Sequence, residues 1–211
     1  MSFRYRIDYA KNNNMRYTSN LDIHKMWERT FRRAKLPLLY SQGFHPQPKI
    51  QQASPLPLGF LSRNEIVDFI LTENLDINHL QELLSSYLPS GIEINRITQI
   101  ELKSPALQTL SEASEYFIYF LDEFNLEVVT EEIEELLSKP AIERIRRGKT
   151  YDLRPLVLEL ELVRENMPFI KMLLKSRESA TGRPEEVLHE LNIPVELTRI
   201  IRNKIILSEI Q

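Results

Sequence analysis

Hydrophobic and polar residues follow two different periods over the first part of the chain, and each period predicts a regular element. Residues 3–9 alternate apolar and polar side chains, which is typical of a strand with one buried face. A helical period follows, which begins at a capping Ser19 or Asn20 and ends at Pro37. The apolar face of this predicted helix consists of Leu21, Met26, Trp27, Phe31 and Ala34.

The same two periods continue to residue 100 and complete a pattern of six elements. Short strands are predicted at residues 49–53 and 65–72, on either side of the stiff segment SPLPLG. Asp76 caps a second helix that runs to Tyr87, and residues 92–100 alternate again as a strand. The resulting order, β-α-β-β-α-β, is that of the split βαβ or ferredoxin-like arrangement.

The remainder of the chain contains a similar order of elements. Strands are predicted at 115–121, 142–147, 155–164, 169–176 and 198–208, helices at 127–137 and 185–191, and a turn at 149–153. We therefore predict an α+β fold made of two ferredoxin-like halves in tandem, the second with an inserted hairpin. The expected boundaries are 1–100 for the first half, 101–114 for a linker and 115–211 for the second half. No residue-level repeat relates the halves, so the tandem prediction depends on element order alone.

The overall charge restricts the ligands that the chain can bind. Of its 211 residues, 42% are hydrophobic and 27% are charged, as in an ordinary soluble domain, and the formal net charge is −3. A protein that coats nucleic acid is usually basic, so any RNA binding here requires a local basic patch. The chain contains no cysteine, which excludes disulfides, thiolate metal sites and a cysteine nucleophile.

Other chemistry is also limited by what the sequence lacks. No apolar run reaches the ~18 residues that span a membrane, and the first residues lack the apolar core of a signal peptide. Zinc, phosphate-loop and nucleophile-elbow motifs are missing. We therefore expect a cytoplasmic protein without a metal or other cofactor, in which His45 is a candidate for a catalytic role if one exists.

The end of the first predicted helix is basic. Arg29, Arg32 and Arg33 lie three to four residues apart, where guanidinium groups can bind phosphate oxygens. The alternative interpretation is a solvated helix end whose cations complement the helix dipole. The loop that follows favours the first interpretation, because Lys49 adds another cation close by.

That loop, YSQGFHPQPK, combines aromatic and amide side chains. Tyr40 and Phe44 are predicted either to stack on bases, as aromatic rings do in single-strand recognition, or to plug the core. Gln42, His45 and Gln47 supply polar groups that can contact base edges.

Two further basic segments occur in the second half. Arg146, Arg147, Lys149 and Arg154 are candidates for phosphate contacts, or they form a charged edge strand that resists aggregation. Arg183 precedes a helix that begins with proline, which indicates either an anion site or a plain loop-to-helix junction. If these segments face the first patch, a cleft between the halves becomes a candidate ligand groove.

Four segments of the chain resemble a known family. They are RRAKLPLLYSQGF and PLPLG in the first half, and KTYDLRPLV and GRPEEVLHEL in the second. They are similar to the bacterial radical-SAM-linked domain of unknown function 2344, and the resemblance covers nearly the whole chain. Members occur alone or fused behind a radical SAM domain, so the resemblance implies a radical SAM protein as partner. Two histidines typical of the family are replaced by Asn20 and Gln47 here, which favours binding over catalysis.

Together these observations predict a radical-SAM-associated binding module that contacts RNA through its basic segments. Two alternatives remain open at this level. One is a protein-interaction module that docks the radical SAM partner, and the other is a metal-free RNA-processing enzyme. No membrane partner and no disulfide-linked partner are expected.

Overall fold

The computed structural model describes residues 1–177 and 180–208, which form two compact units. The first unit comprises Met1–Ser111 and the residues from Leu207 onward, and the second comprises Glu112–Ile206. Both units are mixed α/β structures in which the strand pairs with a known register are antiparallel. None of the helices in the described ranges is long and apolar enough to cross a membrane.

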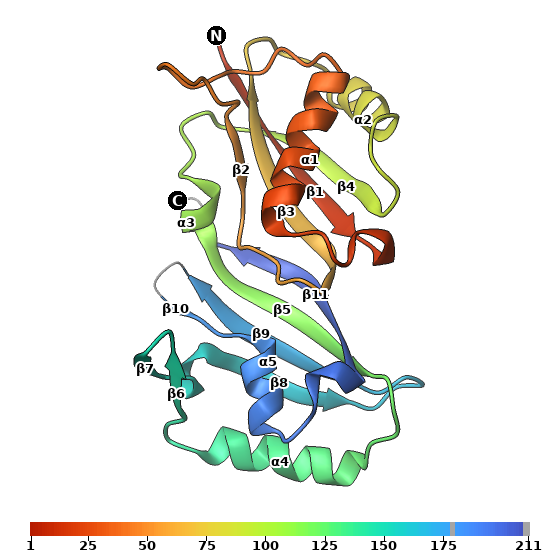
Figure 1. The fold of residues 1–211 in the computed structure, drawn as a ribbon, viewed down its shortest axis with the longest axis vertical. Coiled ribbons are helices and arrows are strands. Elements are labelled where there is room, and N and C mark those ends of the chain that lie inside the picture. Colours follow the sequence, from red (N-terminus) through yellow and green to blue (C-terminus); the bar gives the residue numbers. More distant parts are fainter. Residues whose placement is uncertain (178–179, 209–211) are drawn as a thin grey trace. The chain divides into compact units, whose positions relative to one another are not determined.

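In the first unit, two helices cover one face of a sheet (Figure 1). Its strands lie in the order β2-β3-β1-β4. The elements are β1 (Phe3–Lys11), α1 (Asn20–Arg33), β2 (Ile50–Gln52), β3 (Leu61–Leu71), α2 (Ile77–Ser85), β4 (Ile92–Ile100) and the short α3 (Leu107–Leu110). The predicted strands and helices of residues 1–100 are confirmed, whereas α3 lies inside the segment expected to be a linker.

Helix α1 is fixed at both ends by local hydrogen bonds. The Ser19 hydroxyl accepts a hydrogen bond from the Asp22 backbone N–H at 3.2 Å, which makes Ser19 the N-cap. At the other end, Lys35 adopts a left-handed conformation with φ of 54°. Its N–H and that of Leu36 donate back to the carbonyls of Arg32 and Phe31, which is the Schellman motif.

Aromatic packing determines which face of α1 is buried. The Trp27 ring lies 5.0 Å from that of Tyr9 on β1, and the Phe31 ring stacks 4.5 Å from that of Phe69 on β3. The prediction that Leu21 belongs to this face is wrong, since its side chain is 73% exposed. The reason is geometric, because each helical residue advances by about 100° and Leu21 lies far round the helix from the buried positions.

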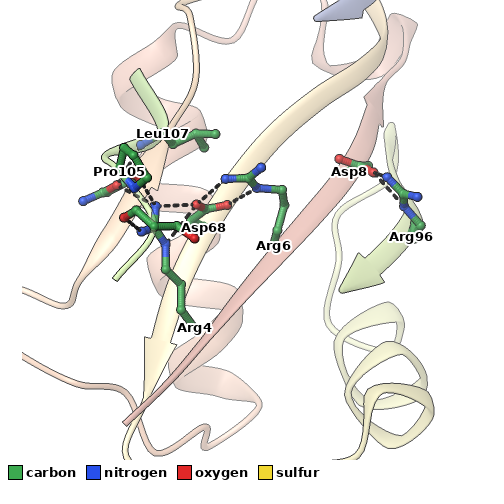
Figure 2. Close-up of polar contacts among 9 residues, drawn as sticks. Arg4, Arg6, Asp8, Asp68, Arg96, Pro105 and Leu107 are labelled. Atoms are coloured by element: carbon green, nitrogen blue, oxygen red, sulfur yellow. Dashed lines mark hydrogen bonds and ion pairs between the residues drawn. The ribbon is translucent and has the colours of Figure 1, made fainter. Parts of the chain in front are cut away.

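The opposite face of the same sheet contains a buried ion-pair network (Figure 2). Asp68 on β3 accepts hydrogen bonds from the guanidinium groups of Arg4 at 2.7 Å and Arg6 at 2.8 Å, both on β1. Arg4 also donates to the backbone carbonyls of Ser104 and Pro105 at 2.6 and 3.0 Å. The expected linker is therefore attached to the first sheet at this point.

The second unit is built around a sheet whose path runs β10-β9-β5-β11, with β8 also paired to β9. A separate two-stranded hairpin consists of β6 and β7. The elements are β5 (Ser111–Phe120), α4 (Leu126–Ser138), β6 (Glu143–Arg146), β7 (Lys149–Asp152), β8 (Val157–Val163), β9 (Phe169–Arg177), β10 (Ala180–Thr181), α5 (Pro184–Glu190) and β11 (Thr198–Leu207).

The turn predicted at residues 149–153 is wrong, because most of this segment is strand β7. It pairs with β6 across a two-residue connection, Arg147-Gly148, in which both residues have positive φ, 53° and 75°. Such a hairpin is normally signalled by Asn-Gly or Asp-Gly. Arginine in the first position removes that signal from the sequence.

The shared carboxylate of Asp68 gives a stability prediction. Asp68→Asn leaves the Arg4 and Arg6 guanidinium groups without their common anion, and Arg4 and Asp68 are 5% and 1% exposed. We expect the free energy of unfolding to fall by about 3–5 kcal/mol, measured by urea denaturation.

The matched control is Asp8→Asn. Asp8 pairs with Arg96 at 2.8 Å, but the Arg96 side chain is 69% exposed and can return to water. The expected loss is about 1 kcal/mol or less. Equal losses for the two variants would contradict the assignment of Asp68 as the charge on which this network depends.

Candidate nucleic-acid interface

Three cations form a row along the outer face of α1. Lys25, Arg29 and Arg33 are spaced four residues apart, so each lies about 6 Å further along the helix axis than the one before. All three are exposed. Each of them is two residues away from the buried Trp27 or Phe31, which is roughly half a turn around the helix axis. The three cations therefore lie on the side of α1 opposite to its buried face.

This row of cations borders a groove of about 330 Å³. The other wall is the segment between α2 and β4. The lining consists of Asp22, Lys25, Met26, Arg29, Thr30 and Arg33 from α1, and Ser86, Tyr87, Leu88 and Pro89 from that segment. The Arg33 guanidinium carbon lies 5.5 Å from the centre of the Tyr87 ring, within the range of a cation–π interaction.

Two charges near the groove have partners on α1 itself. Arg32 lies outside the groove lining, and its guanidinium nitrogen is 3.2 Å from the Glu28 carboxylate one turn earlier. The Asp22 carboxylate accepts a hydrogen bond from the Ser19 hydroxyl at 2.6 Å. The structure therefore brings Arg29 and Arg33 together with Lys25, rather than with Arg32.

The loop YSQGFHPQPK is the tip of a narrow hairpin. Lys49 donates its backbone N–H to the Leu39 carbonyl at 2.8 Å, and Ser41 donates to the Gln47 carbonyl at 2.8 Å. The Gln47 N–H is accepted by the Ser41 hydroxyl at 3.0 Å. Gly43 turns the chain with φ of 125°, a conformation that side chains strongly disfavour.

The two aromatic residues of this hairpin differ in their surroundings. Tyr40 is half-buried and packs against the core of the first unit, as the core-plug interpretation expects. Phe44 is 101% exposed at the tip, so it is no core plug. Gln42, His45, Gln47 and Lys49 are exposed around it. The hairpin thus presents one bare aromatic ring among polar and cationic groups.

In the second unit, the β6 arginines are held by α5. Arg144 lies 3.2 Å from Glu190, and Arg146 donates to Glu186 at 3.0 Å. Arg146 also donates to the Tyr151 hydroxyl at 3.0 Å. Burial lowers the pKa of Arg146, but the hydrogen bond and the charge of Glu186 outweigh it and raise the pKa overall. Burial, followed by Glu186, raises the pKa of Tyr151, so this hydroxyl stays protonated.

The remaining predicted cations of the second unit differ in their contacts. Arg154 donates to the Leu137 carbonyl at the end of α4 at 3.1 Å and to the Val157 carbonyl at 3.1 Å. Arg147 and Lys149 are exposed at the tip of the β6–β7 hairpin. Arg183 is exposed at the N-cap position of α5, without a side-chain capping bond.

Lys25 and Tyr87 are among the groove residues that sequence reasoning missed. Lys25 could have been found, since it precedes Arg29 by one helical turn. Tyr87 could not, because only the fold places it across from Arg33. Over residues 1–177 and 180–208, no group of three or more His, Cys, Asp or Glu side chains is arranged to hold a metal ion.

One comparison with known proteins supports the family assignment of the resemblance, without its link to radical SAM proteins. A family described as an uncharacterized protein conserved in bacteria, domain of unknown function 2344, matches residues 4–184. No curated protein matches the chain. A crystal structure of an unknown protein from Galdieria sulphuraria aligns over 99% of this chain and 100% of its own, with 14% identity and a TM-score of 0.27. Since the family match spans most of the sequence, the chain belongs to the bacterial family of domain of unknown function 2344.

Proposed function

We propose that this protein binds single-stranded RNA and that the outer face of α1 is its main phosphate contact. The observation that carries this proposal is the row of Lys25, Arg29 and Arg33 along one groove. Cations repeated about every 6 Å suit a ligand whose anions also repeat at short, regular intervals.

Tyr87 holds Arg33 in a position suited to binding such a ligand. Its ring supports the Arg33 guanidinium, which reduces the side-chain freedom that Arg33 loses when it binds a phosphate. Arginine binds phosphate oxygens through two parallel hydrogen bonds, whereas lysine acts as a compact point charge. Arg29 and Arg33 therefore orient the strand, and Lys25 adds attraction at its end.

The hairpin that follows α1 contributes base contacts. Phe44 is fully exposed, and an exposed ring offers both faces to a base. Gln42, His45 and Gln47 lie around it and can bind base edges, while Lys49 binds phosphate. In the second unit, the exposed Arg147, Lys149 and Arg183 are proposed as further phosphate contacts, whereas Arg146 and Arg154 hold neighbouring elements in place.

We also infer that each unit is ferredoxin-like. The strand order β4-β1-β3-β2 in the first unit and β11-β5-β9-β8 in the second supports this assignment, because both follow from interleaved βαβ crossovers. The β6–β7 hairpin is then the insertion after the first helix of the second unit.

A second candidate function is docking to a radical SAM protein, which the family resemblance implies. The exposure of Phe44 favours it, because an aromatic side chain that enters a partner's pocket is a frequent anchor of protein interfaces. Under this alternative the cations of α1 meet acidic groups of that partner rather than phosphates.

The RNA proposal predicts a specific salt dependence. A fluorescently labelled single-stranded RNA of random sequence is titrated with the protein over a salt series. The logarithm of affinity should fall linearly with the logarithm of salt, with a slope near −0.7 for each phosphate contacted. Arg29→Ala and Arg33→Ala should each make the slope less steep by about 0.7.

The control is Lys103→Ala, which removes one exposed cation of the first unit away from α1. Its slope should equal that of the unchanged protein. If all three variants change the slope equally, RNA affinity depends only on the net charge of the protein and the groove is not the binding site. A slope near zero for the unchanged protein would remove phosphate contact altogether.

Phe44→Ala tests the hairpin separately. Loss of one stacked base should weaken RNA binding by about 1–3 kcal/mol while the salt slope stays the same, because stacking releases no counterions. Its melting temperature should not change, since Phe44 has no buried surface to lose. Unchanged RNA affinity, together with loss of capture of a co-expressed radical SAM protein, would support the docking function instead.

A further inference from the structure

The sheet of the second unit has aromatic side chains on both faces of its central strands. Tyr116 and Ile118 on β5 are buried, so the alternate residues Phe117 and Tyr119 lie on the other face. The strand register places Tyr119 opposite Phe169 on β9. Phe117 and Tyr119 are only half-buried.

These three rings form one platform. The Phe169 ring lies 4.7 Å from that of Phe117 and 5.2 Å from that of Tyr119, with interplanar angles of 40° and 37°. A pocket of about 550 Å³ opens beside the platform. Its lining consists of Tyr119, Phe169 and the turn residues Glu165, Asn166 and Met167.

The charges near the platform are mainly negative. Lys171 lies two residues after Phe169 on β9, on the same face of the sheet. Its ammonium group is 3.1 Å from Glu161, 3.5 Å from Glu159 and 4.0 Å from Glu115. The hydrogen bond to Glu161 raises the pKa of Lys171, so Lys171 remains a cation. The three carboxylates around it together carry more charge than this one cation, so the cluster is negative. Glu165 adds a further carboxylate in the pocket itself. A phosphate is therefore repelled here, whereas a flat group with hydrogen-bond donors is favoured.

We propose that this pocket binds a guanine base, with the base stacked on the half-buried Tyr119 ring and its Watson–Crick edge directed to Glu165. Guanine presents two adjacent N–H donors on that edge, which match the two oxygens of one carboxylate. Asn166, the next residue, can donate its amide N–H to the guanine O6. Adenine and cytosine each offer one amino group beside an acceptor, and uracil offers one N–H between two carbonyls that a carboxylate repels.

The ligand chemistry is that of the base, whether in free guanosine or in an RNA strand. This site lies within the second unit and uses none of the cations of α1. It can therefore be tested independently of the phosphate groove. For that reason the first probe is the uncharged nucleoside.

The test is a titration of the full chain with guanosine, followed by the backbone amide NMR signals of Glu165, Asn166, Met167 and Phe169, since Pro168 has no amide proton. Guanosine should shift these signals. Inosine, which lacks the 2-amino group, should bind about tenfold more weakly, because one half of the carboxylate pair is lost. Guanosine monophosphate should also bind more weakly than guanosine, because the surrounding carboxylates repel its phosphate.

Two variants separate stacking from edge recognition. Tyr119→Ala should abolish the shifts. Glu165→Gln, at an exposed turn position, should keep the melting temperature and weak binding but bind guanosine and inosine equally. A second arm compares short RNA strands that contain guanine or inosine, and shifts of residues 165–169 only by guanine-containing strands would identify RNA as the source of the base.

Three results would overturn the proposal. The first is that guanosine leaves the signals of residues 165–169 unchanged. The second is that inosine binds as well as guanosine to the unchanged protein. The third is that a simple organic cation such as benzylamine binds with the same dependence on Glu165 and guanosine does not, which would make this pocket a cation site.

Discussion

The packing of Trp27 and Phe31 against β1 and β3 fixes the rotation of α1, and the candidate interface of the first unit depends on that rotation. The two rings contact Tyr9 and Phe69 and are fully buried. Because they define one side of the helix, Lys25, Arg29 and Arg33 must lie on the other. The Schellman motif at Lys35 then ends α1 directly before the hairpin that carries Phe44. Hydrophobic packing thus places the polar groups that the sequence singles out.

The arginines of this acidic chain differ in their bonding partners in a way that the sequence does not reveal. Arg4, Arg6, Arg144, Arg146 and Arg154 each bind carboxylates or backbone carbonyls within their own unit. Arg29 and Arg147 are exposed at positions where the structure gives their side chains no such role. An arginine of this second kind can contribute a phosphate contact without first giving up an internal bond, whereas the exposed Arg32 must first release Glu28. The distinction also explains how a chain with a net charge of −3 can present basic surfaces.

Local patterns predict the elements well and the site only in part. The alternation of residues 92–100 predicts β4 to the residue, and the capping residues Ser19 and Asp76 mark the starts of α1 and α2. Strand β7 is missed because its turn uses arginine where asparagine is the usual signal. The groove is missed because Tyr87 meets Arg33 only through the fold, and the same holds for the pairing of Arg146 with Glu186. Periodicity carries information about neighbours in sequence, whereas sites are made by neighbours in space.

The residues of the turn at Arg147-Gly148 determine whether the charge at the tip of the β6–β7 hairpin changes as the protein ages. The usual residue pair in such turns, Asn-Gly, converts slowly to aspartate and isoaspartate through a cyclic imide, because glycine leaves the asparagine side chain open to attack by the following backbone nitrogen. Arginine has no such reaction. A position with φ of 53° strains an arginine backbone by about 1 kcal/mol relative to glycine. In exchange, the tip of the hairpin keeps its positive charge as the protein ages, instead of acquiring a negative one.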